Sequence, residues 1–280
     1  MATRNPFPQE APAERAPFWL WPNMISLDAP LVAVLWLGAF GTAFSAPLGI
    51  AHFVVLFFCV WCLYTTDRLI DAMKLKAGDV SPGLQTHRHH FMWRRARLFA
   101  FLLFFVGFIG AFLAVTHMER PIFGAGMMVM VAAVAYFGAF VSPLGNKKPL
   151  PGKEVAGGIL FAAGTTLPVF ADYSGTLPVI PAVALFGALC ALNLLMIASN
   201  EGDLPSGRWF RWLLILAGIA LVMTAVGFAI FGTTVATAPM LRPLYFLVAL
   251  SAGALTILQA ARDSASRDAF RVLADVALLT

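Results

Sequence analysis

Eight long apolar stretches, separated by short polar segments, constrain this chain more than any other feature. Each approaches the ~20 residues that an α-helix needs to cross a hydrocarbon core of ~30 Å. Hydrophobic residues make up 60% of the 280 and charged residues only 12%, whereas about a quarter of a typical soluble domain is charged. We therefore predict an all-α, polytopic transmembrane bundle of about eight spans, at residues 29–46, 49–68, 97–116, 121–142, 154–171, 177–200, 210–232 and 243–261.

The segments on either side of this bundle (residues 29–261) differ from it in composition. Residues 1–28 combine charged residues and prolines with the aromatic run Phe18-Trp19-Leu20-Trp21. They predict a cytosolic tail whose aromatic end lies at the membrane interface. Residues 262–280 hold three arginines and three aspartates, too many charges for a span. We expect a second cytosolic tail there, which could lie on the surface as an amphipathic helix.

The distribution of Lys and Arg indicates the orientation of the bundle. If the N-terminus lies inside, all but two of the 19 Lys and Arg residues fall in inner segments or at inner helix ends, and the exceptions are Arg120 and Arg242. Cytoplasmic loops of membrane proteins carry such an excess of positive charge. Both termini are then cytoplasmic, and the bacterial inner membrane is the expected location. The same pattern accounts for the net charge of +5 without a nucleic-acid partner.

Few polar residues interrupt the spans. His52 is the one ionisable residue near the middle of a predicted span. Ion-coupled transporters usually place carboxylates there, so transport is less favoured, and we expect His52 to be a hydrogen-bonded helix contact rather than a proton relay. Cys59, Cys62 and Cys190 lie inside apolar runs. They are expected to pack as small apolar residues rather than to bind metal or act in redox chemistry.

Acidic residues gather at two predicted inner helix ends. Asp67 and Asp71, at the end of the second span, are four residues apart and therefore share one face of a helix. The sixth span ends in Ser199-Asn200-Glu201-Gly202-Asp203. Mg²⁺ suits such a place, because it takes one or two carboxylates together with phosphate oxygens. Alternatively, the first group is a solvated helix end with Arg68 and Lys74 as local partners, and the second is a plain loop.

Basic residues accompany both acidic groups. Lys147 and Lys148 follow the fourth span, with Lys153 just beyond, and Arg88 lies among three histidines. Carboxylates, cations and an apolar bundle together suit a lipid diphosphate, whose phosphates the metal and the basic side chains would hold. The run His-Arg-His-His lacks the spacing of a usual metal site, and a loop facing lipid headgroups is the expected alternative.

In this arrangement the chain resembles the UbiA-type intramembrane prenyltransferases, over roughly residues 25–280. Asp67-Arg68-Leu69-Ile70-Asp71 is similar to the end of the family's first motif, N-x-x-x-D-x-x-x-D, and residues 199–203 are similar to its second motif, D-x-x-x-D. Lys147-Lys148-Pro149 is similar to a basic loop of the family. The resemblance implies that two Mg²⁺ ions between the motifs ionise a prenyl diphosphate, and that a lipophilic or aromatic acceptor attacks the carbocation.

The resemblance also implies roles for individual residues. The implied catalytic residues are Asp67, Asp71 and Asp203, the implied metal ligands are these three and Glu201, and the implied diphosphate ligands are Arg68, Arg88 and Lys148. Leu63 stands where the family has Asn, and Ser199 stands where its second motif has the first Asp. The family's ninth helix is absent or reduced to residues 274–280. These departures leave a second hypothesis, a degenerate relative that binds an isoprenoid or quinone, or serves as a membrane partner, without catalysis.

Overall fold

The eight apolar stretches fold as helices, as their length and composition predicted. The computed structural model describes residues 17–76, 87–141, 152–171, 179–205, 207–232 and 241–279, and this part of the chain contains helices and turns but no strand. An apolar segment in lipid must satisfy its backbone polar groups internally, and an α-helix does so. The eight helices are α2 (Asp28–Phe44), α3 (Ile50–Lys76), α5 (Ala96–His117), α6 (Arg120–Tyr136), α7 (Lys153–Phe170), α8 (Val179–Glu201), α9 (Arg208–Phe231) and α10 (Leu241–Ala260).

Among the described helices, six are long and apolar enough to cross a membrane: α3, α5, α6, α8, α9 and α10. α6 reaches this length because its helical segment continues to Phe140. Of the other two, α2 has only 17 residues, and α7 has 18 but starts with the charged residues Lys153 and Glu154. The short helix α1 (Trp21–Met24) precedes α2, and the segments on the two sides of the break are bent by 78°. The structure therefore supports a multi-pass membrane bundle, while the number of eight spans stays a prediction.

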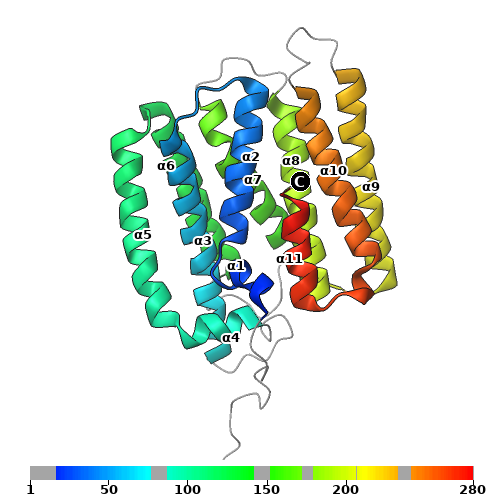
Figure 1. Ribbon diagram of the computed structural model, residues 1–280, viewed down its shortest axis with the longest axis horizontal. Coiled ribbons are helices and arrows are strands. Elements are labelled where there is room, and N and C mark those ends of the chain that lie inside the picture. Colours follow the sequence, from blue (N-terminus) through cyan, green and yellow to red (C-terminus); the bar gives the residue numbers. More distant parts are fainter. Residues whose placement is uncertain are drawn as a thin grey trace, which may run out of the picture.

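Short elements cover one end of the bundle, the lower end in Figure 1. The turn η1 (Phe18–Leu20), α1 and the helix α4 (His87–Arg94) lie across this end. Phe18 and Trp21 are exposed there, whereas Leu20 is buried. The aromatic segment that the sequence placed at the interface thus takes part in packing as well.

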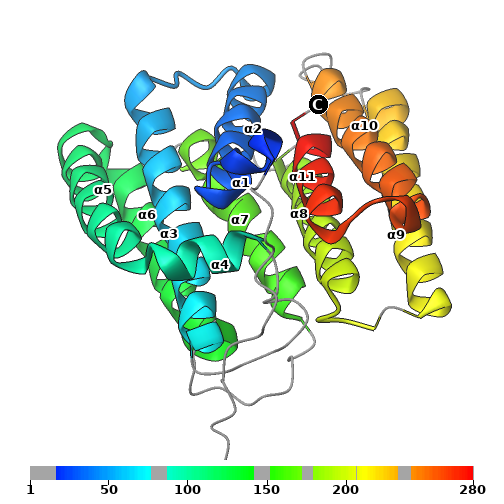
Figure 2. The same ribbon diagram turned by 60° about the horizontal axis from the view of Figure 1, so that its bottom comes forward.

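The basic residues of the described helices separate between the two ends of the bundle. Lys153, Arg208 and Arg262 stand at the starts of α7, α9 and the turn η6 (Arg262–Ser264), which lie at the lower end together with α4 (Figures 1 and 2). Arg120 and Arg242 stand in the first turns of α6 and α10, at the opposite end. This separation agrees with the charge alternation along the sequence, and which end faces the cytoplasm stays a prediction.

The main apolar core lies where α2, α7, α8, α9 and α10 meet. Phe40, Phe186 and Leu255 are among its fully buried side chains. α7 and α8 approach each other closely at Gly158, where a Cβ would collide with the backbone of Ala191. A second, smaller core joins α3, α4 and α5 through residues such as Trp61, Met92 and Phe99. The chain therefore has two halves. The dense half contains α2 and α7 to α10 around the main core, and the loose half contains α3 to α6 around the smaller core.

The charged segment at the C-terminal end packs into the bundle. After η6 the chain reverses into α11 (Arg267–Ala277), which lies beside α8 and α10 and also contacts α2 (Figures 1 and 2). Phe270 and Ala274 are fully buried in the main core, and Trp36 Nε1 donates a hydrogen bond of 2.8 Å to the carbonyl oxygen of Leu278. This corrects the expectation of a tail on the surface. The helix is amphipathic, but its apolar face completes the core and its polar face meets polar side chains of other helices.

Candidate functional site

A large pocket lies within the bundle, with a volume of about 1750 Å³. Its wall comes from α2, α3, α4, α5, α6, α7, α8 and α11. Polar side chains line one end of it, and most of the remaining wall is apolar. This polar end contains Tyr64, Asp67, Arg68, Asp71, Lys74, Arg88, His89, Lys153, Glu201, Asp203 and Arg271. The two acidic groups predicted from the sequence therefore line one pocket, although one lies on α3 and the other at the end of α8.

The apolar wall includes an irregular part of α6. This helix continues into a π-helical turn, η3 (Phe137–Val141), in which the backbone is wider than in an α-helix. Phe137 and Phe140 of this turn line the pocket next to Tyr136. Such π-helical turns are frequent at functional sites. Here the turn lies close to the polar end of the pocket.

The acid pair on α3 lies near two lysines and a histidine. Asp71 Oδ1 accepts a hydrogen bond of 3.0 Å from Lys74 Nζ, and Asp71 Oδ2 lies 3.7 Å from His89 Nε2. Lys153, at the start of α7, is close enough to stabilise the charge of Asp67. Burial and the neighbouring guanidinium of Arg88 lower the pKa of His89 to about 4. At neutral pH His89 is therefore uncharged, and the two lysines carry the compensating charge.

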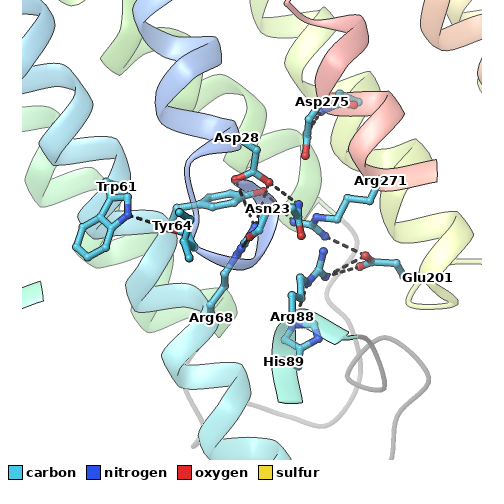
Figure 3. Close-up of polar contacts among 12 residues, drawn as sticks. Asn23, Asp28, Trp61, Tyr64, Arg68, Arg88, His89, Glu201, Arg271 and Asp275 are labelled. Carbon is cyan, nitrogen blue, oxygen red and sulfur yellow. Dashed lines mark hydrogen bonds and ion pairs between the residues drawn. The ribbon is translucent and has the colours of Figure 1, made fainter. Parts of the chain in front are cut away.

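Glu201 is held by two arginines (Figure 3). Arg88 Nη2 lies 2.9 Å from Glu201 Oε1, and Arg271 Nη1 donates to the same oxygen over 3.0 Å. Arg271 Nη2 also donates to the hydroxyl oxygen of Tyr64 over 2.8 Å. Two cations, the buried Arg88 and the largely buried Arg271, already neutralise this carboxylate, so its contacts do not favour the implied role as a metal ligand. Arg88 Nη1 has no hydrogen-bond partner among the described residues, so this side chain can still donate to a ligand.

Arg68 connects α3 to the N-terminal elements (Figure 3). Its Nη2 lies 3.1 Å from Asp28 Oδ2, its Nη1 donates to the carbonyl oxygen of Asn23, and its guanidinium lies 4.7 Å from the ring centre of Tyr64. Both charged side chains of this pair are buried. These contacts make Arg68 a structural residue at the pocket wall, and its implied role in holding diphosphate finds no support in them.

The remaining residues of the predicted site lie in different places. Asp203 is exposed at the rim of the pocket, after Gly202, whose φ of 92° favours glycine. Ser199 donates a hydrogen bond of 3.2 Å to the carbonyl oxygen of Pro205 and so fixes the loop after α8. Leu63 lines the pocket. Lys148 lies outside the described residues.

Several residues at the polar end had no assigned role in the sequence interpretation. Arg271 and Asp275 are one turn apart on α11, and Asp275 Oδ1 accepts a hydrogen bond of 3.4 Å from Asn193 Nδ2. Asn193 and Asp275 are buried, and both line the pocket. The polar stripe of an amphipathic α11 was visible in the sequence, but its position inside the bundle was not.

The described residues contain no preformed cluster for a metal ion, since no group of three or more His, Cys, Asp or Glu side chains could hold one. Mg²⁺ typically takes only one or two carboxylates and completes its shell with phosphate oxygens and water. Asp67 and Asp71 can supply that number, so the residues present fit a Mg²⁺ that arrives with a phosphorylated ligand.

His52 lies at the other end of the pocket, where α3 begins. Its Nδ1 accepts a hydrogen bond of 3.0 Å from the backbone N–H of Gly49, and its Nε2 lies 3.3 Å from Glu119 Oε2. These contacts agree with a hydrogen-bonded helix contact. Cys59, Cys62 and Cys190 are free thiols.

Comparisons of this chain with protein-family models, with curated proteins and with solved structures find no significant match. The functional argument therefore depends on the pocket and on the residues that line it.

Proposed function

We propose that this protein is a membrane prenyltransferase, which transfers a prenyl group from a prenyl diphosphate to a lipophilic or aromatic acceptor with the help of Mg²⁺. The observation that supports this proposal is the convergence of both acidic groups on the polar end of one largely apolar pocket. An amphiphile with an anionic head and an apolar tail matches this division of the wall. The membrane location agrees with the six long apolar helices.

Residues of the polar end have distinct roles in this proposal. Asp67 and Asp71, on one face of α3, would hold Mg²⁺, and Asp203 at the rim could contribute a further carboxylate. When bound, Mg²⁺ neutralises the charge that develops on the diphosphate as the bond between carbon and oxygen breaks. Arg88 donates its free Nη1–H groups to phosphate oxygens. The diphosphate leaves with the electron pair of the broken carbon–oxygen bond, the acceptor forms the new bond to the prenyl carbon, and the proton that the acceptor loses passes to the diphosphate or to water.

The proposal includes an orientation. We place the polar end of the pocket at the cytoplasmic face of a bacterial inner membrane, with eight spans and both termini inside. The basic residues at the lower end of the bundle support this orientation, because cytoplasmic loops carry an excess of Lys and Arg.

The test measures diphosphate release by the full chain in lipid nanodiscs, with a prenyl diphosphate, Mg²⁺ and a panel of aromatic acceptors. Asp67→Asn and Asp71→Asn should each lower turnover by about 100-fold, the size typical of removing an electrostatic stabiliser. Asp263→Asn is the matched control, because this carboxylate on η6 is exposed and does not line the pocket. Unchanged turnover in both pocket variants, with thermal unfolding like that of the wild type, would reject the proposal.

A second candidate is an isoprenoid-binding protein without catalysis. Two observations favour it. Two arginines already pair with Glu201, and Leu63 places an apolar side chain in the pocket wall one helical turn before Asp67. Titration with a non-hydrolysable prenyl diphosphate separates the two candidates. Binding that needs Mg²⁺ favours the transferase, whereas equal binding with and without Mg²⁺ favours the binding protein.

A further inference from the structure

Two arginines from distant parts of the chain meet at the end of α8 (Figure 3). Arg88 belongs to α4 and Arg271 to α11, and both line the polar end of the pocket. Arg88 Nη2 lies 2.9 Å from Glu201 Oε1 and 3.1 Å from its Oε2, and Arg271 Nη1 donates to Oε1 over 3.0 Å. These two guanidiniums, here called the arginine pair, therefore share one carboxylate.

Each member of the arginine pair keeps one unused donor. Arg88 Nε donates to His89 Nε2 over 3.4 Å, and Arg271 Nη2 donates to the hydroxyl oxygen of Tyr64. Arg88 Nη1 and Arg271 Nε are buried and have no hydrogen-bond partner in the part of the chain that the structure describes. Only 5% of the Arg88 side chain and 12% of the Arg271 side chain are exposed. Because an unpaired buried donor is costly, a ligand that accepts hydrogen bonds from both would be stabilised.

The charge at this corner of the pocket is not balanced. The arginine pair carries two positive charges and Glu201 carries one negative charge, so one positive charge remains. Asp275 lies one turn beyond Arg271 on α11. Burial and the neighbouring Asp28 raise the pKa of Asp275 to about 8, so at neutral pH it is largely protonated. Asp28 itself is paired with Arg68. A buried cation needs a partner, and a bound anion can supply it here.

The arginine pair adjoins the acid pair on α3. His89 Nε2, which accepts from Arg88 Nε, lies 3.7 Å from Asp71 Oδ2. A single imidazole ring thus separates Arg88 from Asp71. Arg271 is also close enough to Asp67 to stabilise its charge. A ligand with two linked phosphates can therefore contact a Mg²⁺ at the acid pair and the arginine pair at the same time.

We infer that the arginine pair is a phosphate site that needs no metal ion, and that it replaces the second Mg²⁺ implied by the resemblance to the prenyltransferases. Glu201 is the acid that this second ion would need, and two guanidiniums already neutralise it. Guanidinium donors suit phosphate oxygens in both geometry and charge. The inference deepens the proposed function and rests on it for the identity of the ligand, since it reduces the metal requirement to one ion per chain.

The first measurement counts divalent ions in the wild-type chain in lipid nanodiscs. Methylenediphosphonate, a diphosphate analogue that cannot be hydrolysed, is added to saturation, and Mn²⁺ takes the place of Mg²⁺. Electron paramagnetic resonance then distinguishes free from bound Mn²⁺. One bound Mn²⁺ per chain is expected, because only the acid pair on α3 is available to hold an ion. Two bound ions per chain would overturn the inference.

The second measurement follows the binding of inorganic phosphate in EDTA by phosphorus NMR. The wild type should bind phosphate without any metal. Arg88→Gln should weaken this binding at least about tenfold, or ~1.4 kcal/mol, while Arg271 still pairs with Glu201. Arg97→Gln is the matched control, because this arginine is exposed and does not line the pocket. Absence of phosphate binding to the wild type, or equal binding to a folded Arg88→Gln, overturns the inference. The wild-type measurements decide the question if Arg88→Gln does not fold.

A failure of the proposed function is recognised separately. If phosphate binds in EDTA and depends on Arg88, but no Mn²⁺ is bound with the diphosphonate, the arginine pair is an anion site and the Mg²⁺-assisted transfer fails. If two Mn²⁺ ions are bound and phosphate does not bind in EDTA, the inference fails and the transfer reaction remains supported.

Discussion

The two halves of the bundle differ in how tightly their helices pack. In the apolar stretch of α8, 61% of the residues are buried, against 11% in each of α5 and α6. The main core includes residues of α8, α9 and α10, while α5 and α6 line the pocket. The dense half is suited to hold a fixed shape, and the loose half leaves room for a ligand.

Buried polar contacts join the two halves where they meet. Arg271 of α11 reaches Glu201 of α8 and Tyr64 of α3, and Arg88 of α4 reaches the same glutamate. Charges buried in this way are costly unless each is paired. If the halves are joined as described, changes in the dense half and at this junction should lower stability, and matched changes in the loose half should not.

The largest effect is expected from Arg271→Ala. This substitution removes one of the two cations on Glu201 and the donor to Tyr64, and breaking a buried ion pair by removing one partner costs about 3–5 kcal/mol. Chemical unfolding in detergent micelles measures the loss of stability. Arg97→Ala, an exposed arginine on α5, serves as the control. A loss below about 1 kcal/mol for Arg271→Ala would show that α11 does not hold the halves together.

The next largest loss of stability is expected from a glycine substitution in the dense half, compared with the same substitution in the loose half. Gly158→Ala adds a methyl group against the backbone of Ala191, which cannot rotate away, so overpacking should cost about 1–3 kcal/mol. Gly126→Ala adds the same group into open space and should not destabilise the protein. Thermal unfolding of both variants gives the comparison. Similar melting temperatures would mean that the dense half adapts as readily as the loose half.

His89 provides a pH-dependent test of the junction. Its pKa falls from an ordinary value of 6.5 to about 4 on folding, because the ring is buried and lies next to Arg88. The unfolded chain therefore binds the proton first, and stability should fall by about 1.4 kcal/mol per pH unit as the pH drops from 6.5 towards 4. His89→Gln should lack this contribution. Parallel stability curves for the two proteins over this range would contradict the assigned burial.

The smallest effect is expected for Lys74→Ala. The pair of Lys74 with Asp71 is partly exposed, with 27% of the lysine side chain accessible, and such helix pairs contribute about 0.3–0.5 kcal/mol. The same unfolding measurement should place this variant within about 1 kcal/mol of the wild type. A cost similar to that of Arg271→Ala would mean that the acid pair is as enclosed as Glu201.

The sequence was sufficient to predict the helices and the two acidic groups. Apolar stretches of about 20 residues predict helices, because an α-helix satisfies its backbone hydrogen bonds within one segment, and the spacing of Asp67 and Asp71 placed both on one face of α3. The alternating direction of the helices placed the ends of α3 and α8 on the same side of the bundle, and the packing of the helices brings both ends to one pocket.

The pairing of charges could not be read from the sequence. Nothing local indicates that Arg68 meets Asp28, or that Glu201 meets Arg88 and Arg271, since the partners come from distant helices. An amphipathic helix such as α11 fits two locations equally well. On a membrane surface its apolar face meets lipid and its polar face meets water, and inside the bundle its apolar face meets the core and its polar face meets the polar end of the pocket. Its place was decided by the tertiary packing of Phe270 and Ala274.

The π-helical turn at Phe137–Val141 makes the length of this segment critical. Its hydrogen bonds skip one residue more than those of an α-helix, so the turn accommodates one extra position. Deleting a single residue there would let the backbone relax to regular α-helical geometry and leave the residues beyond it in nearly the same orientation. The wide turn that carries Phe137 and Phe140 along the pocket would then be lost. A change of chain length, rather than of side-chain chemistry, is thus the simplest way for this fold to alter the width of its binding space.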